Sequence, residues 1–353
     1  PIDAVPDITT KQVQINTIDP RLSPVEIEKL VTYPVEIALA GIPGLETTRS
    51  ISRNGFSQVS AIFTDSTDLY FARQQVGERL RQAAEKLPDG VQPQVGPVST
   101  GLGEIVMYTV GYANPDGRGA KKVAGQPGWQ PDGSYLTPEG ERLTDAVAKA
   151  CYLRTVQDWI IGPQLRSVKG VAGVDSIGGY AKTFVVEPDP TKLASFGISY
   201  SELGEALENA NLAVGANYYN RGGEAYLARV DSRVRTVDEI SNAVAATRGG
   251  TPITIGQIAN VRVGGDLRTG AGSMNGEEAV IGTVLMLIGQ NSRVVATEAS
   301  SKLDQVAKTL PPGVQVKVVL NRAELVGATV ATVQRNLTEG AILVAVALFL
   351  LLG

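Results

Sequence analysis

Two carboxylates are the strongest candidates for chemistry in this sequence, because the other common ligand types are scarce. Histidine is absent, Cys151 is the only cysteine, and the three methionines, Met107, Met274 and Met286, are scattered. These counts exclude a Ser-His-Asp site, a histidine-based zinc site and a thiolate cluster, and they give no support to a thioether site for a soft monovalent metal. A metal site here would therefore use oxygen ligands, which bind zinc and similar divalent ions at low affinity.

Glu104 and Asp158 are the two candidate metal ligands. Glu104, in GLGEIV, is expected at the start of a strand between two structural units, where ligand clefts commonly form. Asp158, in QDW, would contribute if its helix faces the same seam. The alternative for both is an ordinary solvated charge, at a strand edge for Glu104 and on a helix surface for Asp158.

Enzyme and nucleotide chemistry find little support. The sequence has no phosphate-binding loop and no Ser-x-x-Lys or G-x-S-x-G motif, and GLGEIV lacks the third glycine of a dinucleotide fingerprint. The formal charge of −4 excludes the basic surface that nucleic acids require. We therefore expect no enzymatic activity, no catalytic residue, no cofactor and no nucleic-acid partner.

The elements that must position these residues follow from sequence periodicity. After a strand, KQVQINTI, the segment SPVE at residues 23–26 forms a capping box that starts a helix, and Pro34 should kink that helix. Two strand-like runs separated by residues 53–55 predict a hairpin. An amphipathic helix follows Asp68. The order is therefore βαββα.

Two internal echoes indicate that this unit occurs twice. The segments KLPDGVQPQV and TLPPGVQVKV, from Lys86 and Thr309, match at a sequence offset of 309 − 86 = 223. A weaker echo links GIPGLET, from Gly41, with GVAGVDS, from Gly170, at an offset of 170 − 41 = 129. The offsets differ by 223 − 129 = 94, so we predict two βαββαβ units, the second interrupted by an insertion of roughly ninety residues.

The insertion should begin near Pro188, end before the buried strand at residues 279–289, and form a small α+β domain. It contains an expected helix, SYSELGEALENAN, and a hairpin around Arg221, Gly222 and Gly223. Residues 112–140 are rich in glycine and proline and aperiodic, which predicts a long exposed loop.

Three single residues carry expectations of their own. Trp129 should be exposed because it lies in this loop. Trp159 should anchor a helix, and Cys151 should be a small packing residue.

The C-terminal pattern is helical after Leu320 and continues without a stop into twelve uncharged apolar residues, 341–352. Twelve residues are fewer than the roughly 20 that cross a bilayer. The continuity predicts a helix that leads into a membrane. The sequence also begins without an initiator Met. Together, the two ends suggest an excerpt of a longer protein.

Six segments in this order resemble the large subunit of proton-driven heavy-metal efflux pumps of the resistance-nodulation-division (RND) superfamily, most closely the cobalt-zinc-cadmium type: PIDAVPDIT, TYPVE, PGLETTRSIS, GLGEI, RTVQDWIIGPQLR and LPPGV. The resemblance covers nearly the whole chain. It implies the first large periplasmic loop, between transmembrane helices one and two of such a pump.

The resemblance implies an α+β fold with two ferredoxin-like split βαββαβ porter subdomains and the start of a transmembrane helix. Residues 1–103 would be the first porter subdomain, and 104–187 with 271–320 the second. A small α+β docking subdomain, residues 188–270, would interrupt the second. Residues 321–353 would lead into a truncated transmembrane helix.

The resemblance also implies function and partners. Such pumps are homotrimers in the lipid bilayer of the bacterial inner membrane, joined by a periplasmic adaptor (membrane fusion) protein and an outer-membrane channel protein. They exchange protons for metal ions, so divalent Zn, Co or Cd would be cargo and this segment would be mostly periplasmic. Glu104 matches the glutamate of GLGEI and becomes a candidate ligand on the metal path. The copper/silver branch is less similar, because a carboxylate occupies that position.

Two other interpretations remain open. A periplasmic ligand-binding sensor module on one membrane helix also accounts for tandem α+β units beside a span. A soluble ferredoxin-like enzyme is the third, although the lack of histidine and nucleophile motifs counts against it. The number of membrane spans in the full reading frame would separate the pump from the sensor.

Overall fold

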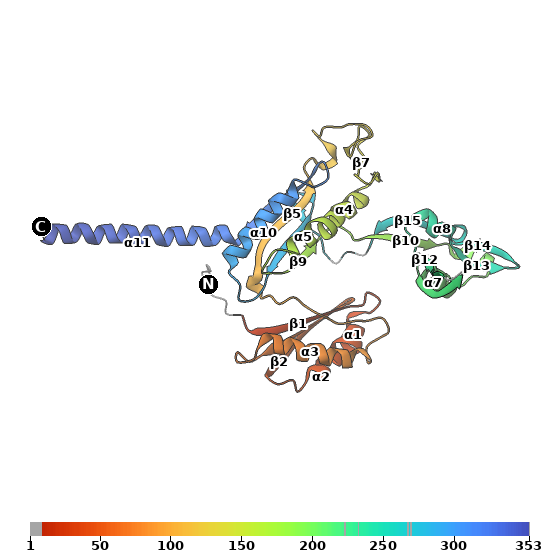
Figure 1. Cartoon of the computed structure of the whole chain (residues 1–353), viewed down its shortest axis with the longest axis horizontal. Coiled ribbons are helices and arrows are strands. Elements are labelled where there is room, and N and C mark those ends of the chain that lie inside the picture. Colours follow the sequence, from red (N-terminus) through yellow and green to blue (C-terminus); the bar gives the residue numbers. More distant parts are fainter. Residues whose placement is uncertain (1–8, 222–223, 232, 267, 269, 353) are drawn as a thin grey trace.

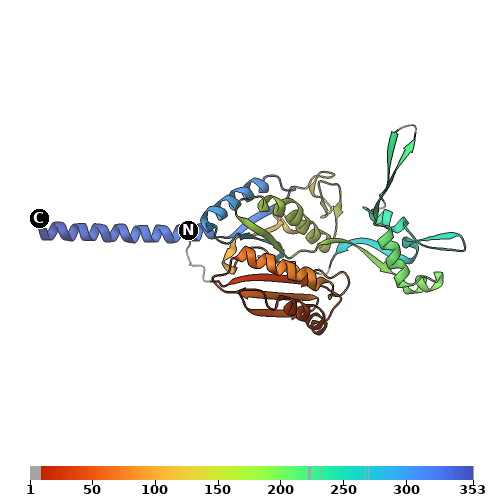
Figure 2. The same ribbon diagram turned by 60° about the horizontal axis from the view of Figure 1, so that its bottom comes forward.

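The computed structural model describes residues 9–221, 224–231, 233–266, 268 and 270–352. Two units, each built of a sheet and helices, lie side by side: the first unit, residues 11–95, and the second unit, residues 104–180 and 270–321 (Figure 1). An insert and a long C-terminal helix extend from the second unit in opposite directions (Figures 1 and 2). Most of the PIDAVPDIT segment and the turn at Gly222 and Gly223 lie outside the described residues.

The first unit has the predicted βαββα order followed by a short fourth strand. Its sheet has the strand order β2-β3-β1-β4. The predicted capping box at Ser23 and Glu26 is confirmed, as is the hairpin that turns after Arg53. The elements are β1 Lys11–Ile18, α1 Pro24–Ile27, the π-helical turn η1 Glu28–Thr32, α2 Tyr33–Leu39, β2 Leu45–Arg53, β3 Phe56–Phe63, α3 Leu69–Ala84 and β4 Gln94–Val95.

The kink predicted at Pro34 takes the form of the π-helical turn η1, with Pro34 in the first turn of α2. The buried apolar residues of this helical segment, Ile27, Val31, Val35 and Leu39, are each four positions apart. In a pure α-helix, four residues overshoot one turn, so this row would drift around the helix. A wider π turn takes up the overshoot and keeps the row facing the sheet.

The second unit repeats this architecture, with its strands in the order β19-β5-β18-β9. Numbered within each unit, both sheets run fourth, first, third, second. Helices α3 and α10 are both 16 residues long, and their first residues, Leu69 and Ser292, differ in number by 292 − 69 = 223, as the stronger echo predicted. The elements are η2 Gly101–Gly103, β5 Glu104–Tyr112, α4 Ala146–Thr155, the π-helical turn η4 Val156–Ile161, α5 Gly162–Arg166, β9 Val171–Ile177, β18 Val280–Met286, α10 Ser292–Ala307 and β19 Val314–Asn321.

The weaker echo needs a correction in its strand portion. Leu45 pairs with Phe63, and Val171 pairs with Met286. Phe63 and Met286 are separated by the offset of the stronger echo, 286 − 63 = 223, so they are equivalent residues of the two sheets. Their partners Leu45 and Val171 are therefore equivalent as well. These partners are 171 − 45 = 126 residues apart, whereas the weaker echo predicted 129. The connection between helix and strand is therefore three residues shorter in the second unit.

Residues 112–140 were predicted to form a long exposed loop, and this prediction is wrong for the segment between β5 and α4, residues 113–145. They fold into an ordered aromatic cap with a three-stranded sheet, β6-β7-β8. Trp129, predicted to be exposed, has only 3% of its surface accessible, and Tyr135 is fully buried. Both rings pack against Tyr112, which comes from the end of β5. The elements are η3 Pro115–Gly117, β6 Gly128–Trp129, β7 Tyr135–Leu136 and β8 Arg142–Leu143.

The insert leaves and re-enters the second unit through a two-stranded ribbon, in which β10, Lys182–Pro188, pairs with β15, Ala259–Gly265. It has a hydrophobic core of its own. An arm formed by β11 and β12 projects from it (Figure 2). The remaining elements are α6 Pro190–Phe196, α7 Tyr200–Asn209, β11 Ala213–Arg221, β12 Glu224–Asp231, α8 Val237–Asn242, β13 Val244–Arg248, β14 Thr251–Thr254 and α9 Ile255–Ile258, and a short hairpin of β16 Ser273–Met274 and β17 Glu277–Glu278 follows.

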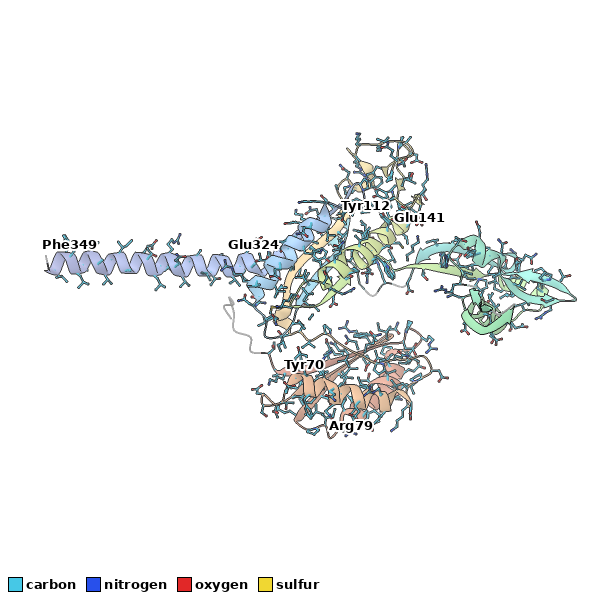
Figure 3. The ribbon with its side chains drawn as sticks, in the orientation of Figure 1. Tyr70, Arg79, Tyr112, Glu141, Glu324 and Phe349 are labelled. Atoms are coloured by element: carbon cyan, nitrogen blue, oxygen red, sulfur yellow. The ribbon has the colours of Figure 1, made fainter. Side chains whose placement is uncertain are left out.

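The C-terminal helix α11, Arg322–Leu352, confirms the predicted continuity. It is the one helix among the described residues that is long and apolar enough to cross a membrane. Figure 3 labels Glu324 near its start and Phe349 near its end, where the side chains project away from the rest of the chain. Large apolar side chains between Ile342 and Leu351 are 50% to 82% exposed, so the chain itself does not cover them.

Candidate metal site and its surroundings

Glu104 opens β5 directly after the short helix η2, and its side chain is exposed. Strand β19 runs antiparallel to β5, so Asn321, its last residue, pairs with Val106 near the start of β5. The guanidinium of Arg322, the first residue of α11, donates to the carbonyl oxygen of Leu102 at 2.5 Å. Glu104 therefore lies where the linker from the first unit, the sheet and the C-terminal helix meet.

Asp158 lies in the π-helical turn η4, and other side chains already use its carboxylate. Arg154 Nε donates to Oδ2 at 2.6 Å, and the hydroxyl of Ser176 on β9 donates to Oδ1 at 2.7 Å. About a third of the side chain remains exposed. Asp158 thus links the π turn to the second strand of the sheet.

The neighbouring Gln157 extends this network into the core. It is fully buried, accepts from the Tyr108 hydroxyl at 3.0 Å and donates to Ser176 Oγ at 3.2 Å. The π turn allows Gln157 and Asp158, which are consecutive, both to bond to Ser176. Sequence analysis missed Ser176 and Gln157, because hydrogen bonds between segments leave no periodic signal. It also missed Arg154, which its i, i+4 spacing to Asp158 could have identified.

The structure does not bring Glu104 and Asp158 together. Asp158 is bonded to Ser176, which lies opposite Gly282, and Gly282 lies opposite Tyr108. Tyr108 is four residues along β5 from Glu104, which corresponds to about 13 Å of strand. Within the described ranges, no group of three or more Asp, Glu or Cys side chains has the geometry to hold a metal ion.

Five cavities are prominent among the described residues, one in the first unit and four in the second unit and the insert. The largest, about 1090 Å³, is an open groove in the insert between α7, α8 and β13. A cavity of about 700 Å³ lies where the second unit meets the insert, and one of about 510 Å³ lies beneath the aromatic cap. A smaller one, of about 280 Å³, includes Arg154 and Ser176, the two partners of Asp158. Neither Glu104 nor Asp158 lines any of these five.

The predictions for two other residues near Asp158 had different outcomes. Trp159 was expected to anchor its helix, but it is 79% exposed, because the π turn directs Gln157 to the sheet and leaves Trp159 outside. Cys151 is buried, as predicted, and its thiol lies 3.8 Å from the carbonyl oxygen of Gly264. Burial raises the pKa of this thiol, which favours the packing role.

Comparison with known proteins finds matches over the whole length of the chain. A family model described as the AcrB/AcrD/AcrF family matches residues 1–353. The chain is 63% identical, over its full length, to the nickel-cobalt-cadmium resistance protein NccA of Alcaligenes xylosoxydans xylosoxydans, covering 33% of that protein. It is 48% identical to the cobalt-zinc-cadmium resistance protein CzcA of Cupriavidus metallidurans, covering 31% of it, again over the full chain.

A more distant relative and a solved structure also match nearly the whole chain. The cation efflux system protein CusA of Escherichia coli K12 is 34% identical over 99% of the chain, which covers 31% of that protein. A crystal structure of a heavy metal efflux pump superimposes with a TM-score of 0.81 at 28% identity, over 99% of this chain and 32% of that one. The chain spans about a third of the length of the relatives that it matches.

Proposed function

The chain belongs to the AcrB/AcrD/AcrF family, and from this premise we propose that it forms the periplasmic porter and docking part of a proton-driven efflux transporter for divalent heavy-metal cations. The observation that carries the proposal is the identity of 63%, over all 353 residues, to a nickel-cobalt-cadmium resistance protein. The match to a heavy metal efflux pump structure supports it. The relatives are named for resistance or efflux, which does not favour the sensor alternative.

The parts of the chain take the following roles in this proposal. Residues 1–103 form the first ferredoxin-like porter subdomain, and 104–187 with 271–320 form the second. The identical strand orders and the separate hydrophobic cores support this division. Residues 188–270 form the docking subdomain, although the ribbon that carries it is already paired from Lys182. Residues 321–353 lead into the membrane.

The assembly follows the pattern of the family. We propose a homotrimer in the bacterial inner membrane, joined by a periplasmic adaptor protein and an outer-membrane channel. The apolar, uncovered surface of α11 supports its place in the bilayer. The two units and the insert would then lie in the periplasm.

The names of the relatives indicate which metal ions are the best candidates for the cargo. Cobalt and cadmium occur in the names of both the 63% and the 48% identical relative, nickel in the first and zinc in the second. We therefore propose Co²⁺ and Cd²⁺ as cargo, with Ni²⁺ ahead of Zn²⁺.

Glu104 is the first proposed ligand on the metal path and Asp158 the second. Glu104 is exposed and has no ion-pair partner within the described residues, so its carboxylate is available to a passing cation. Asp158 would first have to leave Arg154 and Ser176. The two would act at separate steps, because about four residues of strand separate them.

A chimera tests the function. The matching third of the nickel-cobalt-cadmium resistance protein is replaced by this chain, and growth of a metal-sensitive strain is measured on Co²⁺, Cd²⁺, Ni²⁺ and Zn²⁺. We expect the chimera to restore resistance to Co²⁺ and Cd²⁺. A chimera that reaches the membrane in normal amounts but protects against none of these metals contradicts the proposed function.

A matched pair of variants in the same chimera tests the site. Glu104→Gln should lower the tolerated metal concentration, whereas Glu298→Gln, an exposed glutamate on α10 of the same unit, should not. If both variants protect as well as the parent, the assignment of Glu104 is wrong while the transport function stands.

A further inference from the structure

The cavity of about 700 Å³, called here the junction cavity, lies where three parts of the molecule meet: helix α4, the base of the aromatic cap and the ribbon of the insert. Figure 3 labels Glu141, on its rim, at the base of the cap. Small-molecule sites in proteins have volumes of about 300 to 1,000 Å³ and form preferentially where structural units meet. The junction cavity satisfies both conditions and is separate from Glu104 and Asp158.

The floor of the junction cavity is apolar. Its lining includes side chains from the cap, from the helical segment of α4 and η4, and from the ribbon: Leu143, Cys151, Tyr152, Val156, Ile160 and Val263. The first four of these are buried. An aromatic or branched aliphatic group would replace water over this floor, which is the main source of affinity in such sites.

The rim carries charged side chains, most of which are already paired. Glu141 forms an ion pair with Lys182 across the cavity, at 2.5 Å, so these two charges cancel. The two arginines of the lining are paired with carboxylates that do not line it: Arg142 with Asp132 at 2.5 Å, and Arg262 with Glu187 at 2.6 Å.

Two carboxylates, Glu139 and Asp145, remain without an ion-pair partner among the residues that the structure describes. Asp145 accepts a hydrogen bond from the backbone N–H of Ala148, and Glu139 lies 3.5 Å from the Tyr152 hydroxyl. Neither contact brings a positive charge. The lining carries three acidic and three basic side chains, and Glu139 and Asp145 are the two that no ion pair among the described residues neutralises.

Two buried groups of the floor interact with these two carboxylates. The pKa of the Cys151 thiol is raised first by burial and then by the charge of Asp145. The pKa of the Tyr152 hydroxyl is raised first by burial and then by the charge of Glu139. Burial alone raises both pKa values, and the two carboxylates act in the same direction, although Lys182 acts against them at Cys151.

We propose that the junction cavity binds a small organic cation, with an apolar body against the floor and one ammonium or amidinium group between Glu139 and Asp145. A bare metal ion is a poorer occupant, because most of the lining offers it no ligand. An anion would be repelled by these two carboxylates. Such a site is separate from the metal path and would stand even if that path ran elsewhere.

Binding would also affect the insert. An occupant would touch Val263 on the ribbon and Tyr152 on α4 together, so it would stabilise the present position of the ribbon against the second unit. In the absence of an occupant, the contacts between the ribbon and the second unit include the Lys182–Glu141 ion pair and the weak contact of Cys151 with Gly264.

The test uses three probes with the same phenyl group and different charges: 2-phenylethylamine, 2-phenylethanol and 3-phenylpropanoate. Each is titrated into the 353-residue chain in a zwitterionic detergent and followed by ligand-observed NMR. We expect the amine to bind roughly tenfold more tightly than the alcohol, and the carboxylate to bind least. Equal affinities for the three probes would overturn the proposal, as would the absence of binding by the amine at millimolar concentration.

The single cysteine locates the bound probe. Because Cys151 lines the cavity, the amine should slow its alkylation by iodoacetamide, measured by mass spectrometry, and the carboxylate should not. Ala148→Phe fills the cavity from α4 and should abolish binding while the circular dichroism spectrum stays unchanged. If the amine still binds to this folded variant, the site lies elsewhere and the proposal fails.

Charge-neutral substitutions test the role of the rim. Asp145→Asn keeps a side chain that can cap α4 and, combined with Glu139→Gln, removes both unpaired charges. This double variant should bind the amine and the alcohol with equal affinity. Glu298→Gln, far along the chain on α10, is the matched control and should keep the tenfold preference. A double variant that still prefers the amine contradicts the proposed role of the rim.

Discussion

The first and second units share one scaffold, yet only the second carries large additions. In the first unit, five residues join β1 to α1, and two residues join β2 to β3. The equivalent connections of the second unit hold the aromatic cap, between β5 and α4, and the whole insert, between β9 and β18. Long additions at surface connections cost little conformational entropy, so the scaffold tolerates them. The second unit thus combines the common scaffold with surfaces that the first unit lacks.

The two units also differ in charge at one equivalent position. The pairs Val13–Ala61 and Val106–Val284 occupy the same place in the two sheets, because Ala61 and Val284 are separated by the repeat offset, 284 − 61 = 223. The register shifts after Val284, so Glu104 pairs with Leu285. The equivalent of Leu285 in the first unit is Ile62, at 285 − 62 = 223, and Ile62 pairs with Gln12. The position of Glu104 is therefore occupied by the neutral Gln12 in the first unit, and only the second unit has a carboxylate there.

The π-helical turns are common to both units. The last residues of η1 and η4, Thr32 and Ile161, are separated by the offset of the weaker echo, 161 − 32 = 129, and each precedes a proline by two residues. In the first unit, the Thr32 hydroxyl of the turn hydrogen bonds to Ser57 on the sheet at 2.7 Å. The second unit uses Gln157 and Asp158 for the same attachment. Both helices are thus held to their sheets by polar side chains at the turn.

The largest expected effect concerns the addition that only the second unit has. Trp129→Ala removes the ring that packs against Tyr112 and Tyr135, and we expect it to lower the stability of the cap by about 4 kcal/mol. Hydrogen exchange, followed by mass spectrometry, should then lose protection in residues 113–145 and keep it in the first unit. Trp129→Phe, which keeps an aromatic ring, is the control and should lose less. Unchanged exchange in the cap would show that its order does not depend on the aromatic cluster.

The next effect tests whether the shared scaffold folds as two independent units. Ile15 is fully buried in the core of the first unit, so Ile15→Ala should cost about 3 kcal/mol of unfolding free energy there. Both tryptophans lie in the second unit. In urea, the far-ultraviolet circular dichroism transition should gain an early phase while the tryptophan fluorescence midpoint stays unchanged. A matching shift in fluorescence would mean that the two units unfold together.

A smaller effect is expected at the equivalent position of the second unit. Tyr108 occupies the place of Ile15, and its hydroxyl donates to the buried Gln157. Tyr108→Phe leaves the Gln157 oxygen without this donor and should cost about 1.5 kcal/mol, measured by the tryptophan fluorescence transition in urea. Adding Gln157→Leu should recover part of the loss, because the unsatisfied group is then removed. Full additivity of the two losses would show that the Tyr108–Gln157 bond contributes nothing.

The scaffold was predictable from sequence because its signals are local. The capping box at Ser23, the turn after Arg53 and the amphipathic spacing of α3 each involve residues close together in the chain, and each is confirmed. The stronger repeat was visible because α3 and α10 are followed by the same proline-glycine motif. Its offset is reproduced by the helix starts and by the strand register.

The parts that failed depend on contacts between distant segments. Trp129 is buried in part by Tyr112 of β5 and by Gly313, before β19, and a Cβ atom on Gly117 would lie 3.0 Å from its ring. None of these contacts follows from a glycine-rich, aperiodic stretch. Trp159 was misassigned because a π turn changes which residues of a helix face the sheet. The separation of Glu104 from Asp158 depends on sheet register, which the sequence did not specify.

The smallest expected effect concerns the carboxylates of two capping boxes, Glu26 in the first unit and Glu202 in the insert. The backbone amide of Ser23 lowers the pKa of Glu26, whereas the amide of Ser199 and then Arg248 lower the pKa of Glu202 to about 2. Because a lowered folded-state pKa stabilises the charged form, this contribution is complete above the ordinary glutamate pKa and is lost as the pH falls toward 2. Glutamine retains the capping hydrogen bond but not the charge. Glu202→Gln should therefore flatten the acid dependence of thermal unfolding slightly more than Glu26→Gln. Carboxyl ¹³C NMR should show Glu202 titrating below Glu26, and the reverse order would contradict the role of Arg248.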